Sequence, residues 1–496
     1  MAVKVDTQKE IIFGSSNPNI SRVISKKEKD GELRKLAPRI YTTNLIDSPA
    51  NIVRRNLIEI LAYRYPNALI SHRSAKGMRP TSTGDFFLTN STTRRVTDLP
   101  GIILNFVKGP KATAHDIPFM GMHISGEHRY MLENMQLSRK SGDESRVLPI
   151  SVIENKLEQL LLTGGEERLN QYRDELREVA NELGMADEFS KINNIISALL
   201  STHDARVLST DSAKARASGN PFDANRVGLF EILFDTIKDR YFVIRNNRNT
   251  DEDSFRLFSF FESYFSNYIE GTEFDIEEAK EIVDSGIPMP RRDEDSHDIL
   301  GTFKILSNRT EMRRVPTSPE ELFAILSHRH TILLEGRPHM NPGVFKMRNN
   351  RAGQTEFVDY QLVKGTLSQG FKYYSALTDP FARAIFMMFM ISEVHPFNDG
   401  NGRIARVMMN AEFVRADQSR IIVPTVFRED YILALRKLTR HKDPMAYINV
   451  MTKLHQFSDN LYGTDFTELK NYLAACNAYE EPSQAKLQII DRSIRH

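Results

Sequence analysis

The strongest constraint on the fold is the stretch ARAIFMMFMISEV at residues 382–394, which is apolar on nearly every side of a helix. A helix without a polar face has to be buried in a protein core. Asp379 and Pro380 precede the stretch and supply a capping side chain and a first-turn proline. Apolar residues recur at helical spacing again from about Arg403. The sequence therefore predicts two packed core helices joined by the short segment His395–Gly402.

This joining segment has the features of an anion site. Gly400, Asn401 and Gly402 stand directly before the second helix, where free backbone N–H groups bind anions. Arg403 and Arg406 follow in the first turn. Cations there oppose the helix dipole and cost roughly 0.3–1 kcal/mol each, unless an anion lies between them and the helix end. The pattern predicts a bound polyphosphate.

Two further residues of the segment supply chemistry. Asp399 offers one hard oxygen ligand, which suits Mg²⁺ beside phosphate oxygens. His395 can act as a general base near neutral pH. Taken singly, such residues are more often a packed histidine, a turn aspartate or surface arginines. Their occurrence together within twelve residues, 395–406, favours phosphoryl or nucleotidyl transfer.

The same twelve residues, HPFNDGNGRIAR, match the Fic family signature HPFx(D/E)GNGRxxR at every specified position. The resemblance spans roughly residues 225–450. It implies a helical fold that transfers AMP from ATP, with Mg²⁺, to a Tyr, Ser or Thr hydroxyl of a target protein. The roles it implies are proton abstraction by His395, Mg²⁺ binding by Asp399, binding of the α- and β-phosphates by Gly400, Asn401, Gly402 and Arg403, binding of the γ-phosphate by Arg406, and anchoring of the loop by Phe397.

An aromatic helix is predicted upstream, over Ser254–Ile269, with Glu270 closing it and Gly271 as its C-cap. A carboxylate in a last helical turn is disfavoured by the dipole and needs a cation, whereas Arg406 needs an anion. The stretch SNYIEG, Ser266–Gly271, resembles the inhibitory motif (S/T)xxxE(G/N) of Fic proteins. The resemblance implies that Glu270 pairs with Arg406 and keeps the γ-phosphate from its productive position.

The short inhibitory pattern also fits a second stretch, TILLEG at Thr331–Gly336. We favour Ser266–Gly271 because it ends an aromatic helix. A β-hairpin is predicted at Val344–Val358, turning near Asn349, Asn350 and Gly353. It corresponds in position to the flap with which Fic proteins hold the target backbone by strand addition. It lacks a proline cluster after the second strand, so its register stays open.

The amino-terminal region suggests a second activity. A helix-like segment precedes two short strands, Leu33–Leu36 and Ile40–Thr42, around an Ala37-Pro38 turn, which is the layout of a winged helix. Residues 26–39 carry six basic against three acidic side chains. The stretches RKLAPRIYTTN and ANIVRRNLIEILAYRYPNALISHRSA resemble AbiEi-like antitoxin regulators over about residues 10–200. The resemblance implies operator DNA binding through residues 10–75; a solvated helix and hairpin, or a platform for proteins, are the alternatives.

These observations together predict a multidomain chain. A mainly α-helical Fic domain with a short β-hairpin flap is preceded by an α+β winged-helix-like region, with the main boundary in the segment 201–222, rich in small and polar residues. We expect a winged-helix-like part at 1–75, an α+β then helical part at 76–210, a helical lead-in with the inhibitory helix at 222–300, the catalytic core at 301–455 and a helical tail at 456–496.

Composition narrows the remaining options. Lys and Arg number 66 against 65 Asp and Glu, so a polyanion-binding surface over the whole chain is disfavoured. One cysteine, Cys476, excludes an internal disulfide framework and cysteine zinc sites. No apolar run is long enough for a membrane span and no signal peptide is present, so we expect a soluble, cytoplasmic protein. Expected partners are a target protein, the chain itself among the candidates, operator DNA and a second copy in a homo-oligomer, but no membrane.

Several alternatives remain open or are disfavoured. The chain could be a DNA-binding regulator of toxin-antitoxin type whose Fic domain uses another nucleotide or removes AMP. The death-on-curing kinase branch has lysine at the position of Gly402. The stretch GNGRIA also fits a dinucleotide-binding pattern, but that pattern needs a preceding strand. His328, His330 and His339 lack carboxylates at ligand spacing, and we interpret them as surface or flap-adjacent residues.

Overall fold

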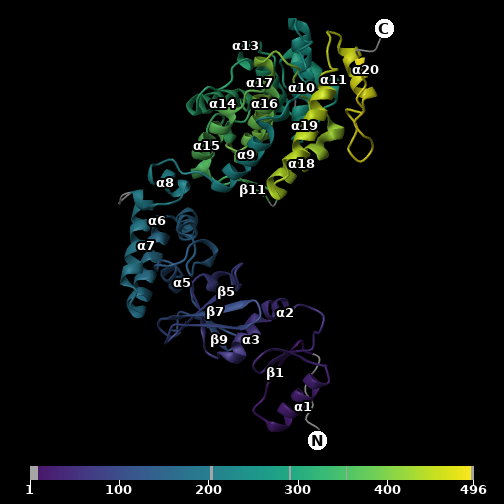
Figure 1. Cartoon of the computed structure of the whole chain (residues 1–496). Helices are drawn as coiled ribbons and strands as arrows, with labels where there is room; N and C mark the ends of the chain where they lie inside the picture. Colours follow the sequence, from purple (N-terminus) through teal and green to yellow (C-terminus); the bar gives the residue numbers. More distant parts are fainter. Residues whose placement is uncertain (1–8, 201–204, 290–291, 354, 493–496) are drawn as a thin grey trace. The chain divides into compact units, whose positions relative to one another are not determined.

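The computed structural model describes residues 9–200, 205–289, 292–353 and 355–492. The chain divides into two compact units, Met1–Ser218 and Gly219–His496 (Figure 1). The first unit combines two β-sheets with helices, and the second consists of helices with one short hairpin. The finer divisions expected at residues 75, 300 and 455 stay predictions.

The first unit begins with a small antiparallel sheet of order β1-β3-β2 beside helix α1. Its helix buries Ile24 against Ile12 and Leu33. The hairpin turns at Pro38 and Arg39, one residue later than expected. The predicted helix and hairpin are therefore present, whereas the winged-helix assignment is not confirmed. The elements are β1 (Ile11–Phe13), α1 (Pro18–Lys29), β2 (Arg34–Ala37) and β3 (Ile40–Thr42).

A six-stranded mixed sheet follows, in the order β6-β7-β5-β4-β9-β8. Strand β5 runs parallel to β7 and β4 parallel to β9, while the other neighbours are antiparallel. Helices α2 and α3 pack on it through residues such as Ile60 and Leu61. The elements are α2 (Pro49–Arg55), α3 (Leu57–Arg64), β4 (Leu69–Ile70), α4 (Arg73–Gly77), β5 (Asp85–Asn90), β6 (Arg94–Leu99), β7 (Ile102–Lys108), β8 (Ile117–Phe119), β9 (Met122–Ile124) and α5 (Glu127–Glu133).

Helices complete the first unit. Helix α6 (Ile150–Leu183) is interrupted at Gly165, whose φ of 68° is not helical. Helix α7 (Ala186–Leu199) packs beside it on a separate apolar core that includes Leu157, Leu176 and Ile196. Helix α8 (Asp211–Ala217) ends the unit.

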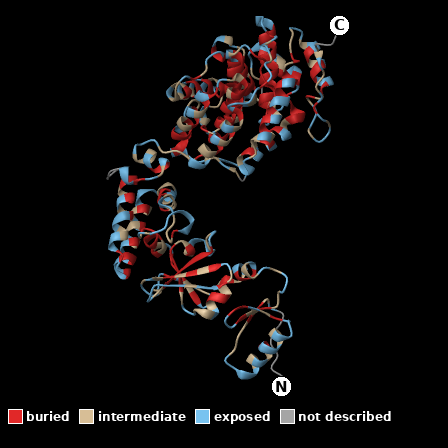
Figure 2. Ribbon diagram, in the orientation of Figure 1, coloured by how far each residue is buried: buried red, intermediate tan, exposed pale blue. Residues whose placement is uncertain are grey.

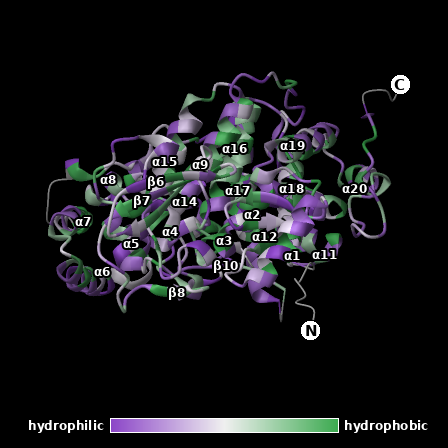
Figure 3. Cartoon of the chain, turned by 60° about the horizontal axis from the view of Figure 1, so that its bottom comes forward, coloured by the Kyte–Doolittle hydropathy of each residue, from purple (hydrophilic) through white to green (hydrophobic). Residues whose placement is uncertain are grey.

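The centre of the second unit is the helix pair predicted from the sequence. Helix α16 (Pro380–Val394) is capped by Asp379, and residues 384–391 are completely buried (Figure 2). The helix is also largely hydrophobic, which is the green end of the scale in Figure 3. Helix α17 (Asn401–Arg415) starts two residues earlier than expected, because Gly400 adopts a left-handed conformation with φ 71° and becomes the N-cap. The pair supplies the floor of the site described below.

Other helices surround this pair. They are α9 (Ala224–Ile237), α10 (Glu252–Ile269), α11 (Ile276–Ser285), α12 (Asp293–Leu306), α13 (Arg309–Met312), α14 (Pro319–Leu333), α15 (Val363–Ala376), α18 (Arg428–His441), α19 (Pro444–Ser458) and α20 (Phe466–Ala475). Cys476 is buried at the end of α20. None of the helices in the described ranges combines the length and apolarity needed to cross a bilayer.

Helix α10 is fixed by a buried polar network. The Glu262 carboxylate pairs with Arg420 at 2.9 Å and accepts a hydrogen bond from the Asn410 amide at 2.7 Å. Arg420 also donates to the Phe255 carbonyl at 3.1 Å and lies over the Phe255 and Phe258 rings. Because a buried ion pair is costly to break, this network holds the body of α10 in place.

The predicted hairpin is shorter than expected. Strands β10 (Arg351–Ala352) and β11 (Thr355–Glu356) contain two residues each, with Arg351 opposite Glu356. Residues 344–350 form no strand, contrary to the prediction. The reason is that their hydrogen bonds go to the segment after α16, as in the bond from the Lys346 N–H to the Pro396 carbonyl at 2.8 Å.

Candidate active site

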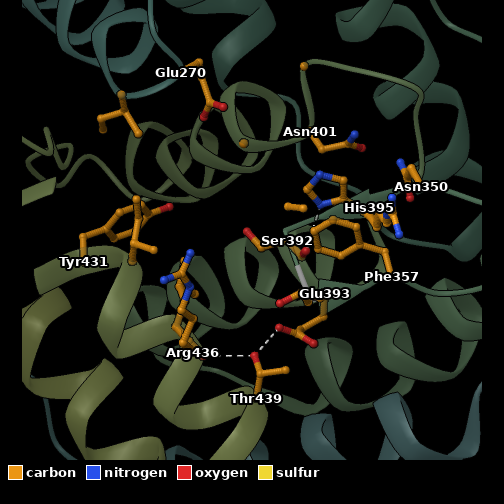
Figure 4. A pocket seen from close by; sticks show the side chains of 18 of the residues that line it. Glu270, Asn350, Phe357, Ser392, Glu393, His395, Asn401, Tyr431, Arg436 and Thr439 are labelled. Atoms are coloured by element: carbon orange, nitrogen blue, oxygen red, sulfur yellow. Dashed lines mark hydrogen bonds between the residues drawn. The ribbon is translucent and has the colours of Figure 1, made fainter. Parts of the chain in front are cut away.

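A pocket of about 530 Å³ lies where the predicted residues meet (Figure 4). Its walls are the end of α10, the β10–β11 hairpin, the loop between α16 and α17, the start of α17, and helix α18. The lining residues central to its chemistry are Glu270, Phe357, His395, Asp399, Gly402 and Arg406.

His395 caps the carboxyl end of α16 in a left-handed conformation, φ 52°. Its Nδ1 lies 3.1 Å from the Ser392 carbonyl, which can only accept, so Nδ1 carries the proton and Nε2 a free lone pair. The ring stacks on Phe357 at 3.5 Å. Burial lowers the pKa of His395 to about 4, although the bond to Ser392 opposes this. The imidazole is thus neutral at pH 7.

The loop between the helices is held from within. Phe397 is completely buried, its N–H donates to the Asn401 side chain, and Asn401 donates back to the Phe397 carbonyl, both at 2.8 Å. The Phe397 ring stacks on His330 at 3.7 Å. Asn401 therefore stabilises the conformation of the loop through its two hydrogen bonds with Phe397. The resemblance did not indicate this contact.

His330 is buried, which corrects the surface alternative for the histidine cluster, whereas its contact with Gly343, just before the predicted hairpin, agrees with the flap-adjacent one. Its Nδ1 accepts from the Gly343 N–H at 2.8 Å, and its Nε2 donates to the Asp399 carbonyl at 3.0 Å. Burial lowers its pKa to about 4. His330 thus ties the loop to α14, while the side chain of His328, two residues earlier, is 51% exposed.

The start of α17 forms an open cradle. Gly400 occupies the N-cap without a side-chain cap bond, and a Cβ on Gly402 would lie only 2.2 Å from the Glu270 carboxylate. Free N–H groups at a helix start and the absence of side chains fit an anionic ligand. Helix α16, not a strand, precedes this cradle, so the dinucleotide-binding alternative fails.

Arg403 is engaged away from the pocket. Its guanidinium pairs with Asp298 at 2.7 Å and lies 3.7 Å from the Asp399 carboxylate. Asp298 also receives a two-point pair from Arg337, at 2.7 and 3.0 Å. Arg403 is not among the described residues that line the pocket, and within the same ranges its buried Nε has no hydrogen-bond partner. Sequence reasoning missed Asp298 and Arg337, for which no motif gives a signal.

Arg406 lies in the pocket and is held by the end of α10. It donates to the Ser266 hydroxyl at 2.9 Å, to the Ser266 carbonyl at 2.8 Å and to the Glu270 carboxylate at 2.7 Å. Burial raises the pKa of Glu270, but Arg406 outweighs it, so the pKa lies below its usual value. The two groups therefore form an ion pair at neutral pH.

The second stretch that fits the inhibitory pattern lies elsewhere. Glu335 is largely exposed and pairs with Lys304 at 3.1 Å. It is not among the described pocket residues. Of the two candidates, only Ser266–Gly271 meets Arg406.

Asp399 keeps an accessible carboxylate, with its side chain 39% exposed and within the pocket. One such carboxylate suits Mg²⁺, which takes further ligands from phosphate oxygens and water. Helix α18 adds pocket residues that sequence reasoning missed, among them Arg428 and, labelled in Figure 4, Tyr431 and Arg436. They follow the signature by more than twenty residues, and no local pattern marks them.

Part of the chain that contains this site is similar to known proteins. The Fic/DOC family profile matches residues 318–412. The chain is 30% identical over 115 residues to protein adenylyltransferase fic-1 of Caenorhabditis elegans, a match that covers 23% of this chain and 22% of the relative. It is 24% identical over 214 residues to protein adenylyltransferase Fic of Nematostella vectensis, covering 40% and 47%. The chain thus spans less than half of these relatives.

Two further likenesses were found. A Fido domain-containing protein of Dictyostelium discoideum is 28% identical over 107 residues, which cover 21% of this chain and 75% of the relative. Among solved structures, Fic-1 of C. elegans superimposes with a TM-score of 0.36 at 16% identity and covers 66% of this chain and 92% of that one. The segment that the Fic/DOC family profile matches, residues 318–412, includes His395 to Arg406.

Proposed function

We propose that the chain is a protein adenylyltransferase that moves AMP from ATP to a Tyr, Ser or Thr hydroxyl of a target protein. The observation that carries the proposal is the neutral His395, with its Nε2 lone pair free, in one pocket with the uncapped start of α17 and Arg406. The names of the matched relatives support the same activity.

In the proposed reaction His395 Nε2 takes the proton of the target hydroxyl. The hydroxyl oxygen attacks the α-phosphorus of ATP, the bond from that phosphorus to the oxygen bridging to the β-phosphate breaks, and pyrophosphate leaves. The N–H groups at the start of α17 stabilise the phosphate oxygens, and Arg406 takes the γ-phosphate. Arg403 reaches the β-phosphate only if it turns from Asp298, from which it now lies 2.7 Å away.

Mg²⁺ would bind at Asp399, and when bound it neutralises charge on the phosphates. The accessible carboxylate supports this role.

We further infer that Glu270 inhibits the enzyme. Its carboxylate occupies the position beside Arg406 that the γ-phosphate would take, and it projects over Gly402. A nucleotide in the productive position therefore has to displace Glu270 from Arg406.

The activity is tested by incubating the full chain carrying Glu270→Gly with ATP labelled at the α- or the γ-phosphate and Mg²⁺. Label from the α-phosphate should become covalently attached to protein, on added lysate proteins or on the chain itself, and γ-label should not. Adding His395→Ala should abolish labelling, while His328→Ala, at an exposed histidine, should not change it. Undiminished labelling with His395→Ala would refute the assignment.

The alternatives within this site are another nucleotide or removal of AMP. A panel of nucleotides, read by intact mass of the modified protein, separates them. A mass gain other than that of AMP would show that the enzyme uses a different nucleotide from ATP. Loss of AMP from a pre-modified protein would reverse its direction.

A second function is proposed for residues 10–75, namely operator DNA binding. It is supported by helix α1, which has Lys26, Lys27 and Lys29 in its last turn, and by the adjoining β2–β3 hairpin. Fluorescence anisotropy of the full chain on its own upstream DNA should show binding that weakens steeply with salt. Equal, weak binding to any DNA would refute a regulator.

A further inference from the structure

A buried lysine lies beneath the proposed base. Lys346, in the segment that leads into β10, is only 3% exposed. Its ammonium donates to the side-chain amide oxygen of Asn350 at 2.7 Å and to the backbone carbonyl of Val394 at 3.4 Å. No carboxylate in the described ranges pairs with it. A buried cation without a carboxylate partner is costly and calls for an explanation beyond packing.

Lys346 and Asn350 together hold the backbone on both sides of His395. The carbonyl before His395, that of Val394, accepts from the Lys346 ammonium, and the one after it, that of Pro396, accepts from the Lys346 N–H at 2.8 Å. The next carbonyl, that of Phe397, accepts from the Asn350 amide at 2.9 Å. Three successive contacts thus join the base of the hairpin to the residues around the proposed base.

The other side of the hairpin contacts the ring itself. Phe357, just after β11, stacks on the His395 imidazole at 3.5 Å and 5° between planes (Figure 4). His395 also has a left-handed backbone, which is unfavourable for a residue other than glycine and persists only where its surroundings impose it. The contacts from the hairpin supply that constraint.

We propose that the Lys346 side chain positions His395. It holds the backbone before the base through the Val394 carbonyl, and through its bond to Asn350 it supports the contact of that amide with the Phe397 carbonyl after the base. This inference rests on the proposed function only where it predicts that Lys346 affects the rate of turnover. The state of the imidazole is a property of the chain alone.

The charges around His395 give the direction of the effect. Burial lowers its pKa most, the Lys346 ammonium lowers it further, and Glu270 and Asp399 oppose them. Burial also lowers the pKa of Lys346 to about 8, so that it remains cationic at pH 7. Removing this cation should therefore raise the pKa of His395.

The test compares Lys346→Met, Lys346→Arg and Lys346→Gln in the full chain carrying Glu270→Gly. Lys364→Met, at an exposed lysine of α15, is the matched control. The first measurement is the pH titration of the His395 ring by NMR with labelled histidine, assigned through the signal lost in His395→Ala. The second is the pH profile of AMP labelling, with kcat and KM for ATP measured separately.

We expect Lys346→Met and Lys346→Gln to lower kcat at least tenfold, with KM for ATP changed less than threefold. The His395 titration and the acid limb of the labelling profile should both move to higher pH, and Lys346→Arg should restore the parent titration. Unchanged His395 titration in folded Lys346→Met overturns the inference, even where labelling falls. If no variant labels, including the parent, adenylylation fails as a function, while the titration still decides the role of Lys346.

Discussion

The two arginines of the first turn of α17 have opposite environments. Arg403 pairs with Asp298, whose side chain is 2% exposed and which also binds Arg337. Arg406 pairs with Glu270, whose carboxylate is 35% exposed and stands at the end of a helix. Both cations need an anion at that helix start, but Asp298 is a buried, shared partner and Glu270 a single, accessible one.

On this basis we distinguish Asp298, a permanent counterion, from Glu270, a replaceable one. Asp298 cannot leave without uncovering two cations, Arg403 and Arg337. Glu270 lines the pocket and its side chain is partly exposed, so we propose that another anion entering from solvent can replace it. The following predictions test the comparison, beginning with the largest effect.

Replacing Asp298 should affect the fold itself. Asp298→Asn removes the charge that neutralises Arg403 and Arg337, and breaking a buried pair costs about 3–5 kcal/mol. Denaturant unfolding of the full chain should show this loss in the transition of the helical unit. Asp295→Asn, on the same helix but 36% exposed, should change stability by less than about 0.5 kcal/mol. A loss below about 1 kcal/mol for Asp298→Asn would contradict the idea of a permanent counterion.

Replacing Glu270 should affect activity more than stability. Glu270→Gly should raise AMP labelling at least tenfold, equivalent to about 1.4 kcal/mol, because the γ-phosphate no longer competes for Arg406. Rates of labelling from ATP provide the measurement. Glu335→Gly, in the second stretch that fits the pattern, is the control and should leave the rate unchanged. Equal rates for Glu270→Gly and the wild type would show that Glu270 does not inhibit.

A smaller effect is expected at Ser266, which accepts from Arg406 through its hydroxyl at 2.9 Å. Ser266→Ala removes one bond to a charged group while the Ser266 carbonyl and Glu270 remain, so labelling should rise about two- to fivefold. Ser263→Ala is the control, since its hydroxyl is also buried on α10 but donates to the Ile299 carbonyl at 2.9 Å. Similar rates for both variants would remove Ser266 from the inhibitory contact.

The smallest effect should come from pH. Arg406 holds the pKa of Glu270 below its usual value despite burial, so the carboxylate stays ionised throughout the range from about pH 6 to 8. The ratio of labelling by Glu270→Gly to that by the wild type should therefore be constant over this range. A ratio that falls toward pH 6 would mean that Glu270 takes up a proton and releases Arg406.

The sequence predicted the parts of the site that depend on neighbouring residues, and it missed the parts that depend on residues far apart in the chain. The core helices, the joining loop and the capped end of α10 were predicted because each is encoded by neighbouring residues, such as Asp379 or Gly271. The meeting of Glu270 with Arg406 followed from helix dipoles and the family pattern together. Asp298, Lys346 and the residues of α18 were missed because their roles arise only from tertiary contacts. The hairpin was predicted too long, since its first half bonds to another segment.

The buried ion pair between Glu262 of α10 and Arg420 limits which part of α10 can move. Glu262 lies eight residues before Glu270, about 12 Å along the helix, so the helix body stays fixed while the exposed carboxylate at its end moves. Exposed side chains change rotamer within picoseconds to nanoseconds, whereas melting of helices takes far longer. If Glu270 is the inhibitory group, its displacement by a nucleotide then requires a change of side-chain rotamer and no melting of α10.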